Sequence, residues 1–407
     1  TVSGSFSWTS AHRLTLDANL NVSFRAPVEV AGQGAVTIVT NDGGTGGDLL
    51  FFDHGRVEFW DLSSSLIING NSYVLVKKLK GLRHAIVNAT EFVALAGNYN
   101  AHNDGTYRKA VIATVGASQT IEGLGNQIQN LTITLTHRDP LALVKDNQGA
   151  IRDLGLTNVN VNARTTGTAA GLAFTSAGTI RNCFVTGTVQ GWRAGGLAYS
   201  VYGSVSHSYA SVAVTGEGGG LVVTNEGTIE TSYATGAVSG HDIAGGLVGA
   251  NNGTISQSFA TGPVTGSYAV GGLVGLQEFL PSGTISNSYA TGSVNGETSG
   301  PVGGLVGTNY WGAIESSYST GLVTGHSNAV GGFVGDVASD SNTDDYWNLD
   351  TSGIDDPHRG AGDFPDDPGI TGLTDAQLKS GLPAGFSPKV WGQSASINNG
   401  YPYLTDN

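Results

Sequence analysis

The sequence predicts an all-β protein that folds as a right-handed parallel β-helix, a solenoid with about 25 residues in each coil. Three observations support this prediction. A unit of about that length recurs at least six times, and each unit holds three short apolar runs separated by glycine. Each run suits a strand and is too short for an amphipathic helix. The chain also combines 63 glycines with 39% hydrophobic residues, a balance typical of a highly turned, ordered fold rather than of disorder.

The repeat sets the register of the coils. Equivalent side chains of successive coils lie above one another, so leucines, isoleucines, aromatic rings and asparagines are expected to form columns. Leu247 and Ile255 are therefore predicted to be buried. Copies begin at Gly195, Gly219, Gly245, Gly271, Gly303 and Gly331, with a degenerate copy near Gly171. The leucine position falls at Leu197, Leu221, Leu247, Leu273, Leu305 and then Phe333, and the aromatic position at Phe184, Tyr209, Tyr233, Phe259, Tyr289 and Tyr318.

The orientation of the aromatic position stays open at this stage. Alternation from Ile229 places Tyr233 inside, whereas counting back from Val238 places Ala234 inside. We expect a turn or bulge near Thr235 and Gly236 to resolve the conflict.

The chain divides into three predicted parts: irregular coils over 1–150, repeat coils over 151–335, and an acidic loop with a capping segment over 336–407. Residues 82–92 are expected to form a short helix that projects from the solenoid. The aromatic residues of the last segment, Trp391 among them, are expected to cover the open end of the stack, because an uncovered end is a sheet edge. Since the chain begins at Thr1, we expect a processed product or a segment of a longer protein.

Charge and cysteine usage exclude several classes of function. The formal net charge is −14, and no run of Lys or Arg exceeds the pair Lys77–Lys78. Nucleic acid is therefore not expected as a partner. No run of apolar residues is long enough to span a bilayer. The single cysteine, Cys183, lies in a strand-like run and is predicted to be a small buried hydrophobe.

Candidate catalytic groups are acidic. Asp53 with His54, Glu122, Asp139 and Asp153 could meet on one face, as an enzyme acting on polysaccharide would require. Without a register for these coils we expect ordinary exposed polar residues and predict no catalytic, cofactor-binding or metal-binding residue.

An acidic segment near the C-terminus is the best metal candidate. Calcium favours loops rich in oxygen ligands, so a structural calcium ion is one interpretation and a solvated loop the other. The acidic residues are Asp336, Asp340, Asp344, Asp345, Asp350, Asp355, Asp356, Asp363, Asp366 and Asp367.

The repeat resembles the GLUG repeat of large bacterial secreted proteins, on the pattern Gly-Gly-Leu-Val-Gly, Gly-Thr-Ile and Ser-Tyr-Ala-Thr-Gly. Residues 66–73, 95–99 and 121–125 are similar to filamentous-haemagglutinin-type exoproteins. This resemblance implies export through an outer-membrane secretion partner and display at the bacterial surface. It implies a non-enzymatic adhesin that binds a glycan or a cell-surface receptor. The alternatives are a β-helix polysaccharide lyase or hydrolase and a self-associating subunit of an extracellular filament.

Overall fold

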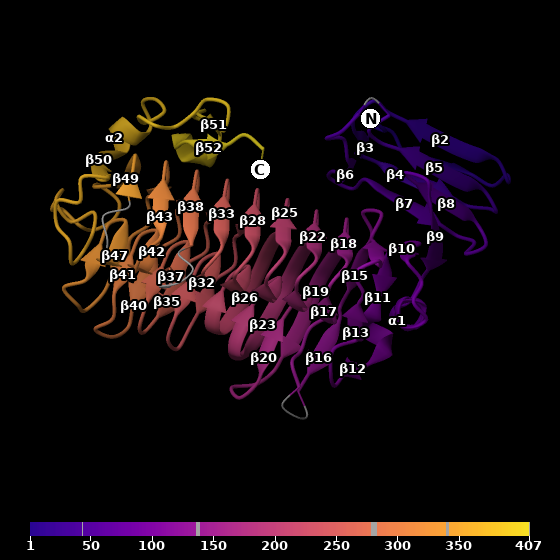
Figure 1. The fold of residues 1–407 in the computed structure, drawn as a ribbon, viewed down its shortest axis with the longest axis horizontal. Coiled ribbons are helices and arrows are strands. Elements are labelled where there is room, and N and C mark those ends of the chain that lie inside the picture. Colours follow the sequence, from indigo (N-terminus) through magenta and orange to yellow (C-terminus); the bar gives the residue numbers. More distant parts are fainter. Residues whose placement is uncertain (43, 136–138, 278–282, 339–341, 407) are drawn as a thin grey trace.

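Short parallel strands stack from coil to coil along most of the chain, as the computed structural model shows (Figure 1). The structure describes residues 1–407 except residues 43, 136–138, 278–282, 339–341 and 407. It is an all-β parallel solenoid of about 12 turns with around 28 residues per turn, which confirms the predicted fold class. The average coil is longer than predicted because some coils hold more residues than others. Ser204 and its partner Thr228 are 24 residues apart, whereas Thr120 and its partner Ala150 are 30 residues apart.

The coils of the main solenoid contribute to three sheets, named here by their numbers of strands; the first coils also form a separate three-stranded and a separate two-stranded sheet. The 22-strand sheet runs from β11 (Tyr99–Asn100) to β50 (Ile370–Leu373). The 14-strand sheet comprises β2 (Arg13–Asp17), β5 (Ala35–Val39), β8 (Ser65–Ile68), β9 (Asn71–Val76), β10 (Phe92–Leu95), β14 (Thr120–Glu122), β18 (Ala150–Arg152), β22 (Thr179–Arg181), β25 (Ser204–Ser206), β28 (Thr228–Glu230), β33 (Thr254–Ser256), β38 (Thr284–Ser286), β43 (Ala313–Glu315) and β48 (Asn342–Thr343). The 9-strand sheet comprises β13 (Ile112–Val115), β17 (Val144–Asn147), β21 (Ala173–Ser176), β24 (Ala198–Val201), β27 (Val222–Asn225), β32 (Val248–Asn251), β37 (Val274–Gln277), β42 (Val306–Asn309) and β47 (Val334–Val337).

Columns of identical or similar side chains fill the interior. Leu247 and Ile255 are both 0% exposed, as predicted. A polar column accompanies the apolar ones: the Asn225 side-chain amide donates to Asn251 Oδ1 at 2.8 Å, and Asn251 donates to Gln277 Oε1 at 2.7 Å. Stacking therefore satisfies buried amides that would otherwise be costly. Cys183 is 1% exposed, and burial raises the pKa of its thiol, which confirms its expected role as a buried hydrophobe.

The structure shows whether Tyr233 or Ala234 faces the core, which the sequence left open. Ala234 is 0% exposed, whereas Tyr233 is half-buried on the outer side. The turn lies at Thr231, whose φ of 45° separates β28 from β29 (Tyr233–Ala234). The expected position near Thr235 and Gly236 was wrong, because a single left-handed residue before the strand already reverses the alternation.

The first strands form a unit of their own, called here the N-terminal unit (residues 1–70). Its sheets are parallel, but β8 pairs with β9 in antiparallel fashion, so the chain direction reverses before the main solenoid begins. The helix α1 (Leu79–Val87) follows and buries Leu79, Leu82, Ala85 and Ile86 in the main core. The expected helix is present, at 79–87 rather than 82–92, but it does not project from the solenoid, because its apolar face covers β10 and β13. Among the described residues no helix is long and apolar enough to cross a membrane.

Near the C-terminal end of the solenoid, Trp347 of β49 (Asp345–Asn348) is 0% exposed and packs against Gly332, and β50 stacks on β49 as the last strand of the sheet. Residues 375–406, called here the C-terminal cap, contain α2 (Asp375–Leu378) and the pair β51 (Trp391–Gly392) and β52 (Tyr403–Leu404). The cap folds back over the flank of the last coils (Figure 1). The expectation that Trp391 covers the open end was wrong, because Trp391 packs against Tyr289 and Tyr318, several coils before the last strand.

Candidate binding surface

The structure separates the predicted acidic candidates. Asp53 is exposed and pairs with Arg25 at 3.4 Å, and His54 and Asp139 are exposed. Glu122 and Asp153 come together, because β14 and β18 are neighbours and pair Glu122 with Arg152. Two of the five candidates therefore share one place in the fold.

The acid pair is held by the arginine between its members. Arg152 Nε lies 2.6 Å from Glu122 Oε2 and 4.0 Å from Asp153 Oδ2. The second Glu122 oxygen accepts the backbone N–H of Leu124 at 2.8 Å, and Asp153 accepts the amide of Asn182 at 3.0 Å. Desolvation by burial raises the pKa of both carboxyl groups, while the Arg152 cation opposes that rise.

This acid pair lies under the N-terminal unit. Glu122 is 0% exposed and Asp153 is 4% exposed. Asn182, which bonds Asp153, also reaches Asp48 Oδ2 at 3.4 Å, and Arg181 pairs with Asp48 at 2.8 Å. The cluster thus joins the N-terminal unit to the solenoid, and a polymeric substrate has no route to its carboxylates.

In the acidic C-terminal segment, Asp336 shares a hydrogen bond with Asp363, and other carboxylates bind separate partners. Asp345 accepts the backbone N–H of Ser317 at 2.9 Å, Asp367 accepts the side-chain amide of Asn342 at 2.6 Å, and Asp366 pairs with His358. Asp340 lies outside the described residues. Within the part of the chain that the structure describes, no three His, Cys, Asp or Glu side chains gather as metal ligands would. Calcium in this segment stays a prediction.

The predicted column of aromatic residues is present as a continuous stack, called here the aromatic ladder. Successive rings lie 4.7–5.1 Å apart between centroids, and their planes differ by 1–8°. The faces of the rings therefore pack on one another, and their edges point away from the core. The ladder consists of Phe184, Tyr209, Tyr233, Phe259, Tyr289 and Tyr318.

The C-terminal cap covers one end of the ladder. Tyr289 and Tyr318 are buried, and the rings of Trp391 and Phe386 pack against them at a tilt. The hydroxyl of Tyr318 donates to the carbonyl of Pro402 at 2.6 Å. The ladder edge is thus a surface that takes up aromatic and polar groups of a polypeptide.

The other end of the ladder stays partly open. Phe184, Tyr209, Tyr233 and Phe259 are half-buried. Beside them runs a column of residues with left-handed backbone, one in each coil; Asn182, His207 and Gln257 belong to it. The four half-buried aromatic residues and these three polar residues are together called the saddle.

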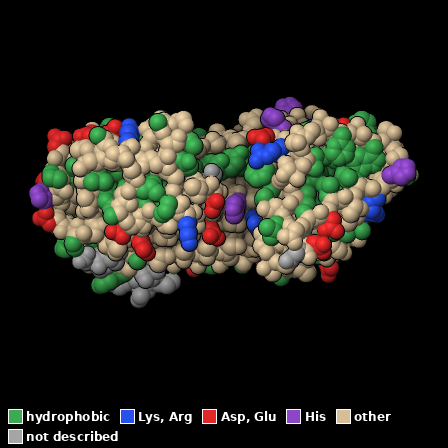
Figure 2. Space-filling model, turned by 90° about the horizontal axis from the view of Figure 1, so that it is seen from above, with side chains coloured by type: hydrophobic (Ala, Val, Ile, Leu, Met, Phe, Trp, Pro, Cys, Tyr) green, Lys and Arg blue, Asp and Glu red, His purple; other side chains and the backbone are tan. Residues whose placement is uncertain are grey.

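The saddle lies between two raised parts of the molecule. Figure 2 shows this surface set back between the lobe of the N-terminal unit and the lobe of the C-terminal cap. The carboxylates of Asp48 in the first lobe and Asp406 in the second interact electrostatically with the His207 imidazole. Partial desolvation, and then the Arg181 cation, lower the pKa of His207, so its imidazole is neutral at pH 7. The saddle therefore presents ring edges, hydroxyls and uncharged polar groups.

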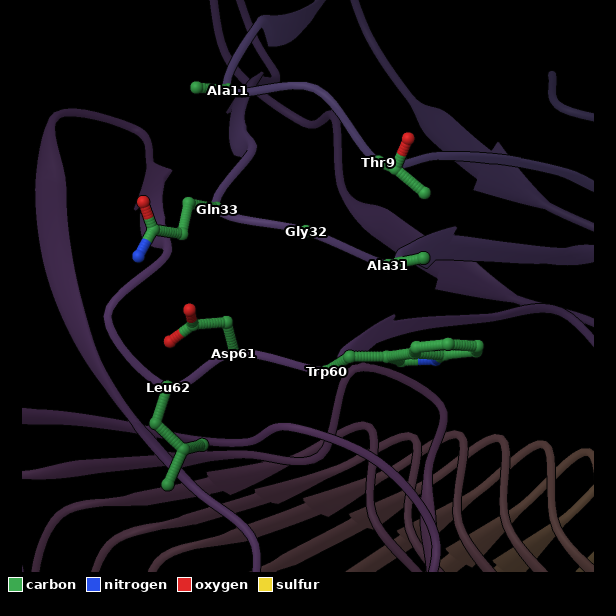
Figure 3. Close-up of a pocket in the computed structure, with 8 residues that line it drawn as sticks. All are labelled: Thr9, Ala11, Ala31, Gly32, Gln33, Trp60, Asp61 and Leu62. Carbon is green, nitrogen blue, oxygen red and sulfur yellow. The ribbon is translucent and has the colours of Figure 1, made fainter.

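A separate depression of about 550 Å³ lies at the edge of the N-terminal unit. Turn residues of three coils line it, among them Thr9, Gln33 and Asp61 (Figure 3). The indole of Trp60 extends along one side, away from the Asp61 carboxylate. This depression holds a single carboxylate among its lining residues and lacks the paired acids of a polysaccharide hydrolase.

The comparisons with known proteins agree with the repeat. Residues 266–295 match the family model described as the GLUG motif. The chain contains a GLUG motif. The search of curated proteins found no match. Among solved structures, the chain is similar to the crystal structure of a proposed immunoglobulin A1 protease from Bacteroides ovatus, at 18% identity, with a TM-score of 0.47, over 83% of this chain and 93% of that chain.

The sequence predicts the aromatic ladder but not the saddle. The spacing of the aromatic residues predicts the stack, yet nothing in the spacing shows which rings the cap covers. Arg152 was missed as the partner of Glu122 and Asp153. Its adjacency to Asp153 and the Ile121–Ile151 register were the available signals.

Proposed function

We propose that this chain is a non-catalytic extracellular binding segment of the adhesin type, and that the saddle holds a glycan or receptor of another surface. The observation that carries the proposal is the division of the aromatic ladder. The cap already uses the ladder edge at Tyr289 and Tyr318 as a binding surface. The same kind of edge continues, half-buried, from Phe184 to Phe259.

Binding is favoured over catalysis by the placement of the acidic groups. The acid pair Glu122 and Asp153 is buried, and Glu122 is ion-paired with Arg152. The outward positions of the 14-strand sheet are instead rich in hydroxyl groups, with Thr179, Ser204 and Thr228 in successive coils. A smooth flank of this kind suits contact with a surface better than bond cleavage.

Filament assembly through the ends of the solenoid is less favoured. The helix α1 packs on the first coils of the main core and covers that end. A covered end opposes the strand-to-strand stacking that an open filament requires.

The GLUG motif and the solenoid also support a bacterial surface location. A filamentous-haemagglutinin-type exoprotein, exported by an outer-membrane secretion partner, is the form of adhesin that we propose. We propose no cofactor for this chain.

A glycan array combined with a cell-binding assay tests the proposal. The double variant Tyr209→Ser with Tyr233→Ser removes both hydroxyls and two of the four rings that the cap leaves open. We expect it to reduce binding at least about tenfold. The matched control, Tyr202→Ser with Tyr268→Ser, removes two tyrosines that are 53% and 50% exposed outside the saddle and should bind as the wild type does.

Two results would overturn the proposal. One is equal binding by the saddle variant and the wild type. The other is release of oligosaccharides when the protein is incubated with a panel of acidic and neutral polysaccharides, which would establish an enzyme.

A further inference from the structure

A cluster of lysine and arginine side chains lies at one place in this acidic protein. Residues 77–83 carry Lys77, Lys78, Lys80 and Arg83 and no acidic residue, in a chain with a net charge of −14. All four side chains are exposed. Among the described residues, Lys78, Lys80 and Arg83 form no ion pair. Exposed cations without carboxylate partners leave a local positive potential that can attract an anion.

These cations line two adjoining depressions, called here the basic cleft. The first, of about 410 Å³, lies between Trp60, Lys77 and Tyr99. The second, of about 370 Å³, lies between Lys80, Arg83 and Tyr107. Lys78 and Tyr99 line both, so the two depressions adjoin. Each is large enough for a small ligand.

The carboxylates of the cleft are already engaged. Glu58 pairs with Arg56 within its own strand. Asp104 accepts hydrogen bonds from the hydroxyls of Tyr99 and Tyr107, the latter at 2.7 Å. These bonds fix both tyrosine rings in the wall of the cleft. The four cations therefore outnumber the two carboxylates among the lining residues.

The beginning of α1 adds to the positive potential. Lys78 precedes the helix without a side-chain cap, and the first turn holds no acidic residue. The first turn also lines the second depression, through Leu79 and Lys80. The positive end of the helix dipole thus has the same sign as the surrounding cations.

Aromatic side chains lie beside the cations. Trp60 is 59% exposed and borders both the cleft and the depression of Figure 3, and Tyr99 and Tyr107 are half-buried. An exposed indole offers an apolar face with a polar edge, which suits the C–H face of a sugar ring. Lysine and arginine then pair with a carboxylate or sulfate on that sugar.

We infer that the basic cleft binds an acidic oligosaccharide, with Trp60 stacking on a sugar ring and Lys78 and Arg83 pairing with its acidic groups. The site is separate from the saddle and does not depend on the function proposed for the saddle. The two depressions together accommodate a few linked sugar units.

Titration calorimetry with the whole chain tests the inference. The probes are an oligogalacturonate, a sulfated heparin fragment, a neutral cello-oligosaccharide and a single-stranded DNA oligonucleotide, each at low and high salt. We expect one or both acidic saccharides to bind, with affinity that falls as salt rises, and no binding of the neutral saccharide. The carboxylated and sulfated probes distinguish the two sources of negative charge.

Charge-matched variants locate the binding. Lys78→Gln with Arg83→Gln should weaken saccharide binding about tenfold or more. The control, Arg108→Gln with Lys109→Gln, removes two exposed cations that do not line the cleft and should change affinity less than about twofold. Trp60→Ala should weaken binding without changing its salt dependence. The saddle variant should bind the acidic saccharide as the wild type does.

Three outcomes would overturn the inference. No acidic saccharide binds, the two charge variants lose affinity equally, or DNA binds while both acidic saccharides do not. In each case the basic cleft is not a saccharide site, whatever the result at the saddle.

Discussion

The indole nitrogen of Trp391 donates a hydrogen bond to Oδ1 of Asn287, 3.0 Å away and 104 residues earlier in the chain. This bond ties the C-terminal cap to the turn that precedes the aromatic ladder. Trp391 is 1% exposed and packs against Tyr289 and Tyr318. The cap therefore decides where the ladder is covered and where the saddle begins.

Loss of the Trp391 side chain should loosen the cap. We expect Trp391→Ala to lower the free energy of unfolding by about 3–5 kcal/mol, because a large buried ring and its hydrogen bond disappear. Urea denaturation followed by circular dichroism measures the change. Trp192→Ala removes an indole that is 50% exposed and should change stability by less than about 0.5 kcal/mol. Equal effects of the two substitutions would refute this account of the cap.

A charge in the leucine column should prevent folding. Leu247 is 0% exposed and lies between Leu221 and Leu273, to which its backbone is hydrogen-bonded. We expect Leu247→Asp to abolish the cooperative thermal transition, because a buried carboxylate without a partner costs several kcal/mol. Leu247→Met, a swap of similar volume, should cost less than about 1.5 kcal/mol. A normal melting curve for Leu247→Asp would show that the register is mistaken.

Removal of the arginine in the acid pair should release the N-terminal unit. Arg152→Met leaves Glu122 and Asp153 buried without their cation, and we expect a loss of about 3–5 kcal/mol at pH 7. Limited proteolysis should then cleave near the junction with the solenoid. Adding Glu122→Gln and Asp153→Asn to the same chain should restore much of the stability. Failure of this rescue would mean that Arg152 acts by packing alone.

The pH dependence of stability should carry a contribution from Asp336. Desolvation, followed by a hydrogen bond shared with Asp363, raises the pKa of Asp336 to about 6. A carboxyl group whose pKa is raised on folding binds more protons in the folded state. Its contribution is therefore fully present below about pH 4 and is lost as pH rises through about 6.

The variant Asp336→Asn should show this directly. At pH 7.5 its Tm should exceed that of the wild type by about 1 °C, a small effect because the group is partly exposed. At pH 4.5 the two Tm values should converge. Asp355→Asn, at an exposed position, should leave the pH profile unchanged. A Tm difference for Asp336→Asn that does not vary with pH would contradict the raised pKa.

The sequence by itself determined the solenoid and, in the repeat coils, the columns and their register. Leu247, Ile255 and the aromatic ladder follow from repetition alone, because identical units that stack must place identical side chains above one another. Which residue of β29 faces the core also depends on the left-handed backbone of Thr231, and no residue pattern predicted that conformation.

Only the tertiary structure decided which surfaces stay open. The reversal between β8 and β9 places Asp48 beside Arg181, and the N-terminal unit then buries Glu122 and Asp153. At the other end, the cap places Trp391 on the flank of the solenoid rather than on its end. The basic cleft likewise forms where Trp60 meets α1. These contacts join segments far apart in the chain that share no repeat, so the local periodicity that fixed the coils holds no information about them.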